Sequence, residues 1–219
     1  AVRQRYFSIQ HDWSEVVDYA REVGVELGTV NSNTFQDEAY KFGSLAHHDP
    51  AVRQKAVEHH LECIDVMNQI GSSDLKIWLA DGTNYPGQGD LRRRQDWLAE
   101  SLAAIYPHLN ENQRLVLDVP DWGTAYTQVA ALGERAVVCL DTGHHAPGTN
   151  IEFIVAQLLR LGKLGSFDFN SRFYADDDLI VGAADPFQLF RILWEVRRGG
   201  AFQKATGVAF MLDHWHNIQ

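Results

Sequence analysis

The chain has 219 residues, 45% of them hydrophobic and 22% charged. This is an ordinary globular composition, and the length suits one large α/β domain or two small ones. The net charge is −10 and the longest basic run is Arg92-Arg93-Arg94, which argues against a nucleic-acid surface because phosphate binding requires a concentrated positive field. No apolar run approaches the roughly 20 residues that span a bilayer, and no signal-peptide core opens the chain. We therefore expect no membrane partner and a cytoplasmic location.

Short β-branched runs alternate with longer helical patterns. The runs predicted as strands are Tyr6–Ile9, Val25–Val30, Leu75–Leu79, Leu115–Leu117, Ala136–Asp141, Gly165–Phe169 and Val208–Asp213. The predicted helices are Ser14–Val23, Ala51–Ile70, Leu91–Tyr106, Trp122–Leu132, Ile151–Leu161 and Pro186–Val196. Asn150 is placed to begin a helix, and Gly24, Gly71, Gly133 and Gly162 stand where helices should end.

The repeated strand–helix order predicts an α/β fold with parallel strands and right-handed crossovers. A doubly wound sheet and a closed barrel both fit that order. The strand-end residues Asp141, Asp168 and Asp213 favour a (β/α)8 TIM barrel, whose site is built from the C-terminal ends of several strands. A dinucleotide fold would more often show a G-x-G-x-x-G turn, which the chain lacks. With about seven βα units visible against the eight of a closed barrel, the barrel is expected to be incomplete.

Three acidic clusters indicate divalent metal binding. Asp141-Thr142-Gly143-His144-His145 directly follows a strand, so a carboxylate and an imidazole share one turn. Asp168-Phe169-Asn170 is followed by Asp176-Asp177-Asp178, and Asp213-His214-Trp215-His216 follows the last strand. The alternatives are an Asp that caps a turn, an exposed acidic loop and a frayed tail.

Neutral sugar binding is indicated by the segment Trp78–Gln88, which contains Asp81, Asn84 and Tyr85. An aromatic ring can cover the C–H face of a polyol while amide and carboxylate groups bond its hydroxyls. The alternative is a turn rich in Gly, Pro and Asn. The loop Asn31–His48 also follows a strand, and loops of this length are usually functional.

Other chemistries have less support. The chain contains no G-x-S-x-G elbow and no P-loop. Cys63 and Cys139 lie in apolar runs, which favours buried free thiols over a disulfide or a catalytic thiolate. A carboxylate pair could serve glycoside hydrolysis, but the excess of Asp and His favours a metal.

Several segments resemble the bacterial L-rhamnose isomerases of broad specificity. They include NSNTFQDEAYKFGSLAHH, LKIWLADGTNYPGQ, VCLDTGHHAPGTN, FDFNSRFYADDDL and VAFMLDHWHN, and the resemblance covers nearly the whole chain from about Val25. It implies a xylose isomerase-like TIM barrel, usually a homotetramer, that interconverts aldoses and ketoses such as L-rhamnose and L-rhamnulose or D-allose and D-psicose.

The resemblance also implies two Mn²⁺ sites, with Co²⁺, Mg²⁺ or Zn²⁺ as alternatives. The structural metal would take Asp141, Asp168, Asp213 and a glutamate, and the catalytic metal would take His144, Asp176 and Asp178. Catalytic roles fall to His144 and Asp213. Trp78 and Asp81 would contact the monosaccharide, whose hydrogen moves between C2 and C1 by hydride shift or through an enediol.

The chain departs from the family pattern in several places. Leu117 is joined directly to Asp118, where the family has a Glu-Tyr-Lys motif and about a dozen further residues, so Asp118 is expected to replace the ligand glutamate. The strand-one histidine has only Gln10 or His11 as a stand-in. We therefore expect residues 1–219 to form a single isomerase domain, truncated at both ends and carrying an internal deletion near 117–118. The alternatives are a non-catalytic or weakly active binding remnant, or a related TIM-barrel sugar epimerase.

Overall fold

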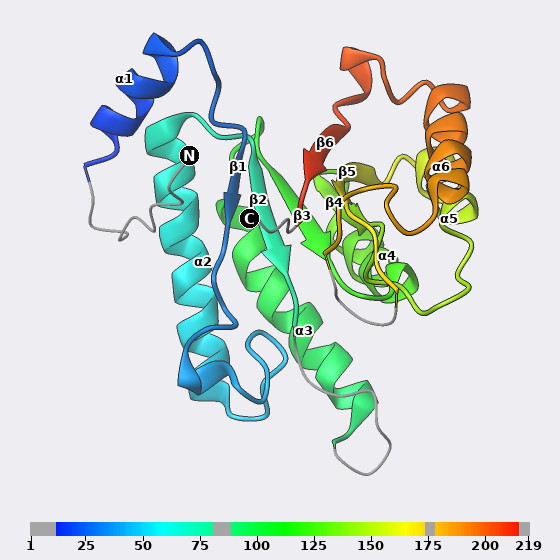
Figure 1. The fold of residues 1–219 in the computed structure, drawn as a ribbon. Helices are drawn as coiled ribbons and strands as arrows, with labels where there is room; N and C mark the ends of the chain where they lie inside the picture. The colour runs from blue at the N-terminus through cyan, green and yellow to red at the C-terminus, as the bar shows by residue number, and fades with distance from the viewer. Residues whose placement is uncertain (1–11, 81–88, 174–177, 215–219) are drawn as a thin grey trace, which may run out of the picture. The chain divides into compact units, whose positions relative to one another are not determined.

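The computed structural model describes residues 12–80, 89–173 and 178–214 (Figure 1). The chain divides into two compact units, Ala1–Leu115 and Val116–Gln219. Among the described residues, no helix combines the length and the apolar character needed to cross a membrane.

The first unit contains two parallel strands covered by helices. Its elements are α1 (Ser14–Glu22), β1 (Thr29–Asn31), the 3-10 turn η1 (Glu38–Tyr40), α2 (Pro50–Ile70), β2 (Asp74–Trp78), α3 (Leu91–Ile105) and η2 (Tyr106–His108). Val30 of β1 is opposite Leu75 of β2. Helix α2 packs against both strands and runs beside α3 (Figure 1). Met67, Ile77 and Leu102 are fully buried there and form part of the core.

Local sequence sets the ends of α2. The Asp49 carboxylate accepts a hydrogen bond from the Ala51 N–H, and Pro50 occupies the first turn, where a missing N–H costs nothing. Gly71 ends the helix with φ of 74°, a left-handed conformation that favours glycine. The end of this helix at Gly71 was predicted from the sequence.

Strand β1 begins later than the predicted Val25–Val30. The Val25 N–H donates to the Ala20 carbonyl, so residues 23–25 complete the C-terminal cap of α1 and do not enter a strand. Ladder pairing begins at Thr29, after the Gly28 carbonyl accepts from Ser73 and Asp74.

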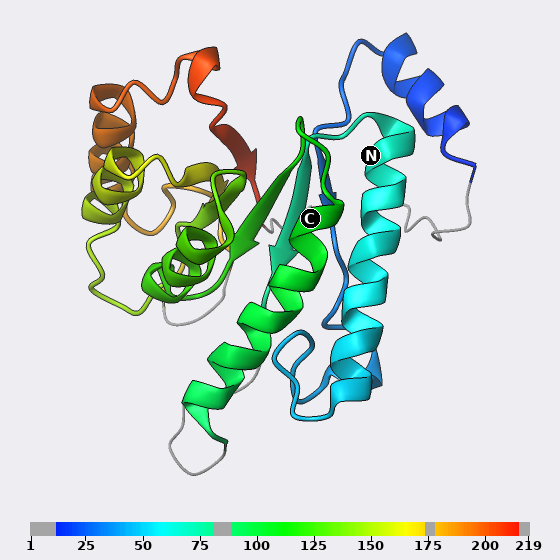
Figure 2. The ribbon, with the colours of Figure 1, turned by 180° about the vertical axis from the view of Figure 1, so that it is seen from behind.

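The second unit repeats the strand–helix order. After β3 (Arg114–Asp118), which crosses the division, come α4 (Trp122–Leu132), β4 (Ala136–Asp141), α5 (Ile151–Arg160), β5 (Leu164–Phe169), α6 (Pro186–Arg198), the 3-10 turn η3 (Lys204–Thr206) and β6 (Ala209–Leu212). Strand β5 pairs in parallel with β4 and β6, with Asp168 opposite Asp141 and Met211. Helices α5 and α6 lie side by side (Figure 2).

These elements confirm the predicted α/β class and all six predicted helices. Helix α6 runs to Arg198, beyond the predicted Val196, and the added Arg197 and Arg198 suit the negative end of a helix dipole. Six of the predicted strands are present, and the seventh, Tyr6–Ile9, lies outside the described residues.

Candidate metal centre

Four aspartates stand at or beside the C-terminal ends of four successive strands. Asp118 ends β3, Asp141 ends β4, Asp168 is the penultimate residue of β5 and Asp213 follows β6. One ligand atom from each of Asp118, Asp141 and His144 lies within 4.8 Å of the others, and the same holds for Asp141, Asp168 and Asp213. Because parallel strands present their C-terminal ends at one edge, residues far apart in the sequence converge in the second unit.

Side-chain alternation adds a residue that the sequence analysis left as an inert thiol. Cys139 lies two positions before Asp141 in β4, so both side chains point to the same face of the strand. A third group with ligand atoms within 4.8 Å consists of Asp118, Cys139 and Asp168. The period of two along β4 is the signal that could have placed this sulfur beside the aspartates.

His144 faces three carboxylates. Its Nδ1 lies 3.5 Å from Asp141 Oδ2 and 3.9 Å from Asp118 Oδ1, and its Nε2 lies 3.9 Å from Asp178 Oδ1. The sequence analysis assigned Asp141 and Asp118 to one metal and His144 and Asp178 to the other. In the structure the His144 imidazole lies close to carboxylates of both predicted ligand sets.

The Asp141 carboxylate is strongly influenced by burial. Burial raises the pKa of this carboxyl to about 7, with a further upward contribution from Asp118, while His144 and the hydrogen bonds from Gly143 and Asn170 oppose the rise. Oδ1 accepts hydrogen bonds from the backbone N–H groups of Gly143 and His144, at 2.7 and 3.1 Å. The Asp141 carboxylate therefore stabilises the turn and is also a member of the acidic cluster.

A divalent cation fits this donor set. Buried carboxylates within a few ångströms of one another resist ionisation unless a positive charge lies among them. Carboxylate oxygens with one imidazole suit Mn²⁺, Mg²⁺, Co²⁺ or Zn²⁺. Asp118, Asp141 and Asp168 are buried and Asp213 is exposed, so the acidic group extends from the core to the surface.

Asn170, which the sequence analysis named in the second cluster without giving it a role, also contacts the candidate ligands. Its amide nitrogen donates to both oxygens of Asp141, at 3.0 and 2.9 Å, and to Asp178 Oδ1 at 3.1 Å. Asp178 has a φ of 43°, which Asp tolerates better than most side chains. Such conformations gather at functional sites.

Both ring nitrogens of His145 lie within hydrogen-bonding distance of backbone groups. Its Nε2 accepts a hydrogen bond from the Trp122 N–H at the start of α4, and its Nδ1 lies 3.2 Å from the Asp141 carbonyl oxygen. Burial lowers the pKa of its imidazole. Of the two adjacent histidines, His144 is therefore the candidate ligand.

Two predicted site residues, Asp81 and Asp176, lie outside the described residues, as do Gln10, His11 and His216. Trp78 ends β2 in the first unit and is half-buried. The Phe35 ring meets it edge-on, with 4.8 Å between ring centroids. Phe35 belongs to the loop that follows β1, so the predicted sugar-contact residue is part of an aromatic pair.

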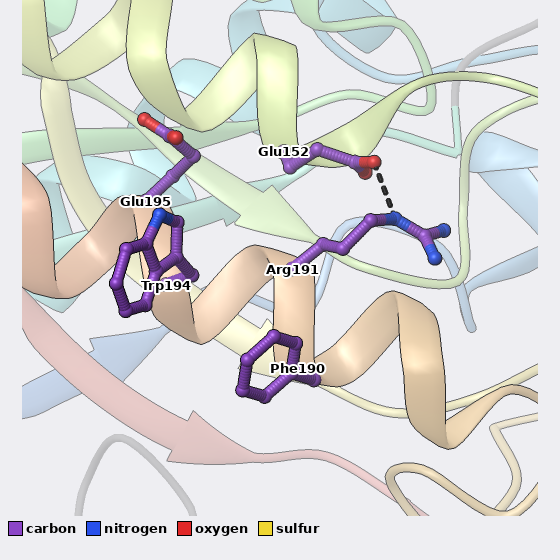
Figure 3. A pocket seen from close by; sticks show the side chains of 5 residues that line it. All are labelled: Glu152, Phe190, Arg191, Trp194 and Glu195. Atoms are coloured by element: carbon purple, nitrogen blue, oxygen red, sulfur yellow. Dashed lines mark hydrogen bonds and ion pairs between the residues drawn. The ribbon is translucent and has the colours of Figure 1, made fainter.

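A separate hollow of about 350 Å³ lies on the surface of the second unit (Figure 3). It is lined by Phe190, Arg191, Trp194 and Glu195 of α6 and by Glu152 of α5. Arg191 Nε lies 2.6 Å from Glu152 Oε1, so two of the three charged residues that line the hollow form an ion pair. Its lining contains none of the candidate metal ligands, which distinguishes this hollow from the acidic cluster.

The chain is similar in sequence to proteins named as sugar isomerases. A probable sugar isomerase from Rhizobium meliloti (strain 1021) is 39% identical over 239 residues, covering 96% of this chain and 55% of that protein. A second, from Mesorhizobium japonicum, is 40% identical, covering 91% and 50%. Over most of its length, this chain is thus similar to two proteins named as probable sugar isomerases. The xylose isomerase of Thermus thermophilus is 29% identical over 184 residues, covering 74% and 47%. The chain spans about half the length of these relatives, and no family model matches it.

Solved structures share the fold. A D-tagatose 3-epimerase-like protein superposes with a TM-score of 0.70 at 14% identity, covering 91% of this chain and 74% of that one. The D-psicose 3-epimerase of Clostridium cellulolyticum H10, solved with D-tagatose, has a TM-score of 0.65 at 14% identity, covering 96% and 71%. The IolI protein, solved with a zinc atom, has a TM-score of 0.64 at 15% identity, covering 94% and 73%. These likenesses confirm the predicted fold class, an incomplete (β/α) barrel.

Proposed function

We propose that the chain is part of a metal-dependent aldose–ketose isomerase that takes L-rhamnose to L-rhamnulose and related sugars such as D-allose to D-psicose. The observation that carries the proposal is the convergence of Asp118, Asp141, Asp168 and Asp213, with His144 beside the first two. Similarity to proteins named as sugar isomerases supports the same reaction class. The more specific substrate rests on the resemblance of the sequence motifs to L-rhamnose isomerases.

The reaction is an internal redox exchange. The hydrogen on C2 of the open-chain aldose moves to C1, and a proton moves from the C2 hydroxyl to the C1 oxygen, so that the ketose has the same atoms as the aldose. A bound divalent metal would supply Lewis acidity to the sugar oxygens and a template for the open chain. The relevant metals are Mn²⁺ first, with Co²⁺, Mg²⁺ or Zn²⁺ as alternatives, in two proposed sites.

In this proposal each of the two metal ions has its own set of ligands. Asp118, Asp141, Asp168 and Asp213 would hold the structural ion, with Asp118 in place of the family's glutamate. His144, Asp178 and Asp176 would hold the catalytic ion, and Asp213 would also contact the reacting sugar. In the structure β3 ends at Asp118 and α4 begins at Trp122. The internal deletion near residues 117–118 is also part of the proposal and rests on the family resemblance.

Trp78 would provide an apolar surface for the sugar in the same proposal, with Asp81 binding a hydroxyl. The edge-on contact with Phe35 restricts the orientations open to the Trp78 ring. A ring held in one orientation loses less conformational entropy when a ligand stacks on it. Assembly as a homotetramer is also proposed from the family resemblance, and light scattering of the purified chain would test it.

A sugar epimerase is the second candidate. It is favoured by the fold, since the superposing structures include proteins named as D-psicose and D-tagatose 3-epimerases. The two reactions share the open-chain sugar and differ in which carbon exchanges hydrogen. Product identity therefore separates them.

The test is product analysis with the purified chain and Mn²⁺. L-rhamnose, D-allose and D-psicose are each incubated with the protein, and the products are identified by ¹³C NMR. Ketose from the aldoses supports the isomerase, whereas conversion of D-psicose to its C3 epimer without aldose formation supports the epimerase. Metal binding without turnover of any of the three sugars would refute both activities for this chain and leave the binding remnant.

A further inference from the structure

Asn170 connects two candidate ligands that come from different loops. It follows β5 directly and is 4% exposed. Its amide nitrogen donates to the carboxylate of Asp141, at the end of β4, and to that of Asp178, in the segment after β5. One amide therefore holds together two carboxylates that would otherwise repel one another.

The backbone of Asn170 is fixed independently of its side chain. The Asn170 N–H donates to Thr142 Oγ1 at 3.0 Å, and the Thr142 hydroxyl donates to the Asn170 carbonyl oxygen at 2.8 Å. Thr142 belongs to the turn that carries Asp141 and His144. The Thr142 hydroxyl thus ties the turn after β4 to the Asn170 backbone, which helps to direct the Asn170 amide toward the carboxylates.

Gly143 provides the space for this amide. A Cβ added at Gly143 would lie 2.2 Å from Asn170 Oδ1 and 3.1 Å from its Cγ, and no real Cβ contact is as short as the first distance. The amide oxygen is buried against this glycine and has no hydrogen-bond partner in the described part of the chain. The hydrogen bonds of the amide nitrogen set the orientation of the Asn170 side chain, because a flipped amide would point its oxygen at two carboxylates.

We infer that Asn170 is a positioning residue for the metal ligands, and that Gly143 is required because it makes room for the Asn170 amide. The inference rests on the proposed metal-binding function. Asn170 acts by holding the Asp141 and Asp178 carboxylates, which belong to the two proposed ligand sets, in fixed positions and by offsetting part of their charge through its amide N–H donors. Outer-shell groups of this kind typically alter metal affinity 10- to 100-fold.

The test compares Asn170→Ala and Gly143→Ala with the parent chain and with Asn150→Ala. The control removes one asparagine that caps α5, through a 2.9 Å bond to the Phe153 N–H, and it leaves the acidic cluster intact. Mn²⁺ affinity is measured by calorimetry, and the visible absorption spectrum of bound Co²⁺ reports the ligand geometry.

We expect both site variants to bind Mn²⁺ about 10- to 100-fold more weakly and to change the Co²⁺ spectrum, while Asn150→Ala matches the parent in both measurements. A folded Asn170→Ala protein with the parent's affinity and spectrum would overturn the inference. A parent that binds neither metal would overturn it as well.

Asn170→Asp is a second variant for the case in which Asn170→Ala does not fold. It preserves the size of the side chain and replaces the donor nitrogen with an oxygen. In EDTA at pH 8 this variant should melt at a lower temperature than the parent, and Mn²⁺ should recover part of the loss. Equal melting temperatures in EDTA would contradict the inference. None of these measurements involves a sugar. If the variants show the expected changes in metal binding and stability but the parent converts no aldose, the proposed isomerase activity is refuted and the inference about Asn170 stands.

Discussion

Nδ1 of His144 lies 3.5 Å from Oδ2 of Asp141, three residues earlier in the chain. They meet because the turn after β4 folds back on itself, and Asp141 Oδ1 accepts the N–H groups of Gly143 and His144 that hold the turn. A turn cap and a metal ligand were alternative interpretations of this aspartate in the sequence. The structure allows both, since Oδ1 binds the turn and Oδ2 faces the imidazole.

Metal removal should destabilise the protein. A cation held by the strand-end aspartates binds the folded chain and not the unfolded one, so saturation at about 100 times the Kd contributes about 2.7 kcal/mol. For a chain of this length, that corresponds to a rise in Tm of about 5–10 °C. Thermal melts in EDTA and in excess Mn²⁺ measure the difference. Identical melting curves in the two buffers would contradict a metal centre.

Asp141→Asn should abolish tight metal binding while it preserves the turn after β4. The amide oxygen can still accept the two turn N–H groups, but the buried negative charge is lost. We expect Mn²⁺ affinity to fall by more than the roughly 10- to 100-fold that follows from loss of a residue that only supports a ligand. Asp185→Asn is the matched control, because Asp185 caps α6 through the Gln188 N–H and asparagine caps helices equally well. A comparable loss in the control would assign the effect to folding.

His60 should make the chain sensitive to acid. Burial lowers the pKa of His60 to about 4 from an ordinary value of 6.5, although the hydrogen bond to the Ala56 carbonyl opposes this shift. Between those pH values the unfolded chain binds a proton that the folded chain excludes, so stability is present above pH 6.5 and falls as the pH drops toward 4. The loss is up to about 3 kcal/mol.

Replacing His60 with Leu should therefore flatten the pH dependence of urea unfolding between pH 6.5 and 4. His108→Leu provides the control, since this histidine is exposed at the end of η2. An unchanged pH profile for His60→Leu would show that other groups dominate acid unfolding.

Gly165→Ala should destabilise the second unit by overpacking. An added Cβ would lie 2.2 Å from Val137 Cγ2, across the β4–β5 pair. The expected cost is about 1–3 kcal/mol in the free energy of unfolding. Val137→Ala should restore part of the loss in the double variant, because it removes the methyl groups that clash. Gly28→Ala, where the added Cβ meets nothing within 4 Å, should be near neutral.

Trp78→Ala should weaken sugar binding in the proposed isomerase more than it slows turnover. Loss of the aromatic surface is worth about 0.5–1.5 kcal/mol beyond its area, which corresponds to a rise in KM of up to about tenfold. Trp78→Phe should retain much of the affinity, since a ring remains beside Phe35. Steady-state kinetics with L-rhamnose measure both constants. A fall in kcat at constant KM would argue against a binding role for this ring.

Much of the fold was predictable because it depends on local chemistry. The limits of α2 follow from Asp49, Pro50 and Gly71, and the register of buried and exposed residues follows from periodicity. The start of β1 was not predictable, because it depends on where the cap of α1 ends and where pairing with β2 begins. That choice involves hydrogen bonds from Ser73 and Asp74, more than 40 residues away.

By itself, the sequence determined that several strands end in aspartates and that His144 follows one of them in a sharp turn. Only the tertiary structure decided which of these side chains meet. The register between β4 and β5 brings Asp168 level with Asp141, alternation along β4 adds Cys139, and the glycine at 143 leaves space for the Asn170 amide. Strand pairing is a non-local interaction, so the distances between carboxylates exist only once the chain has folded.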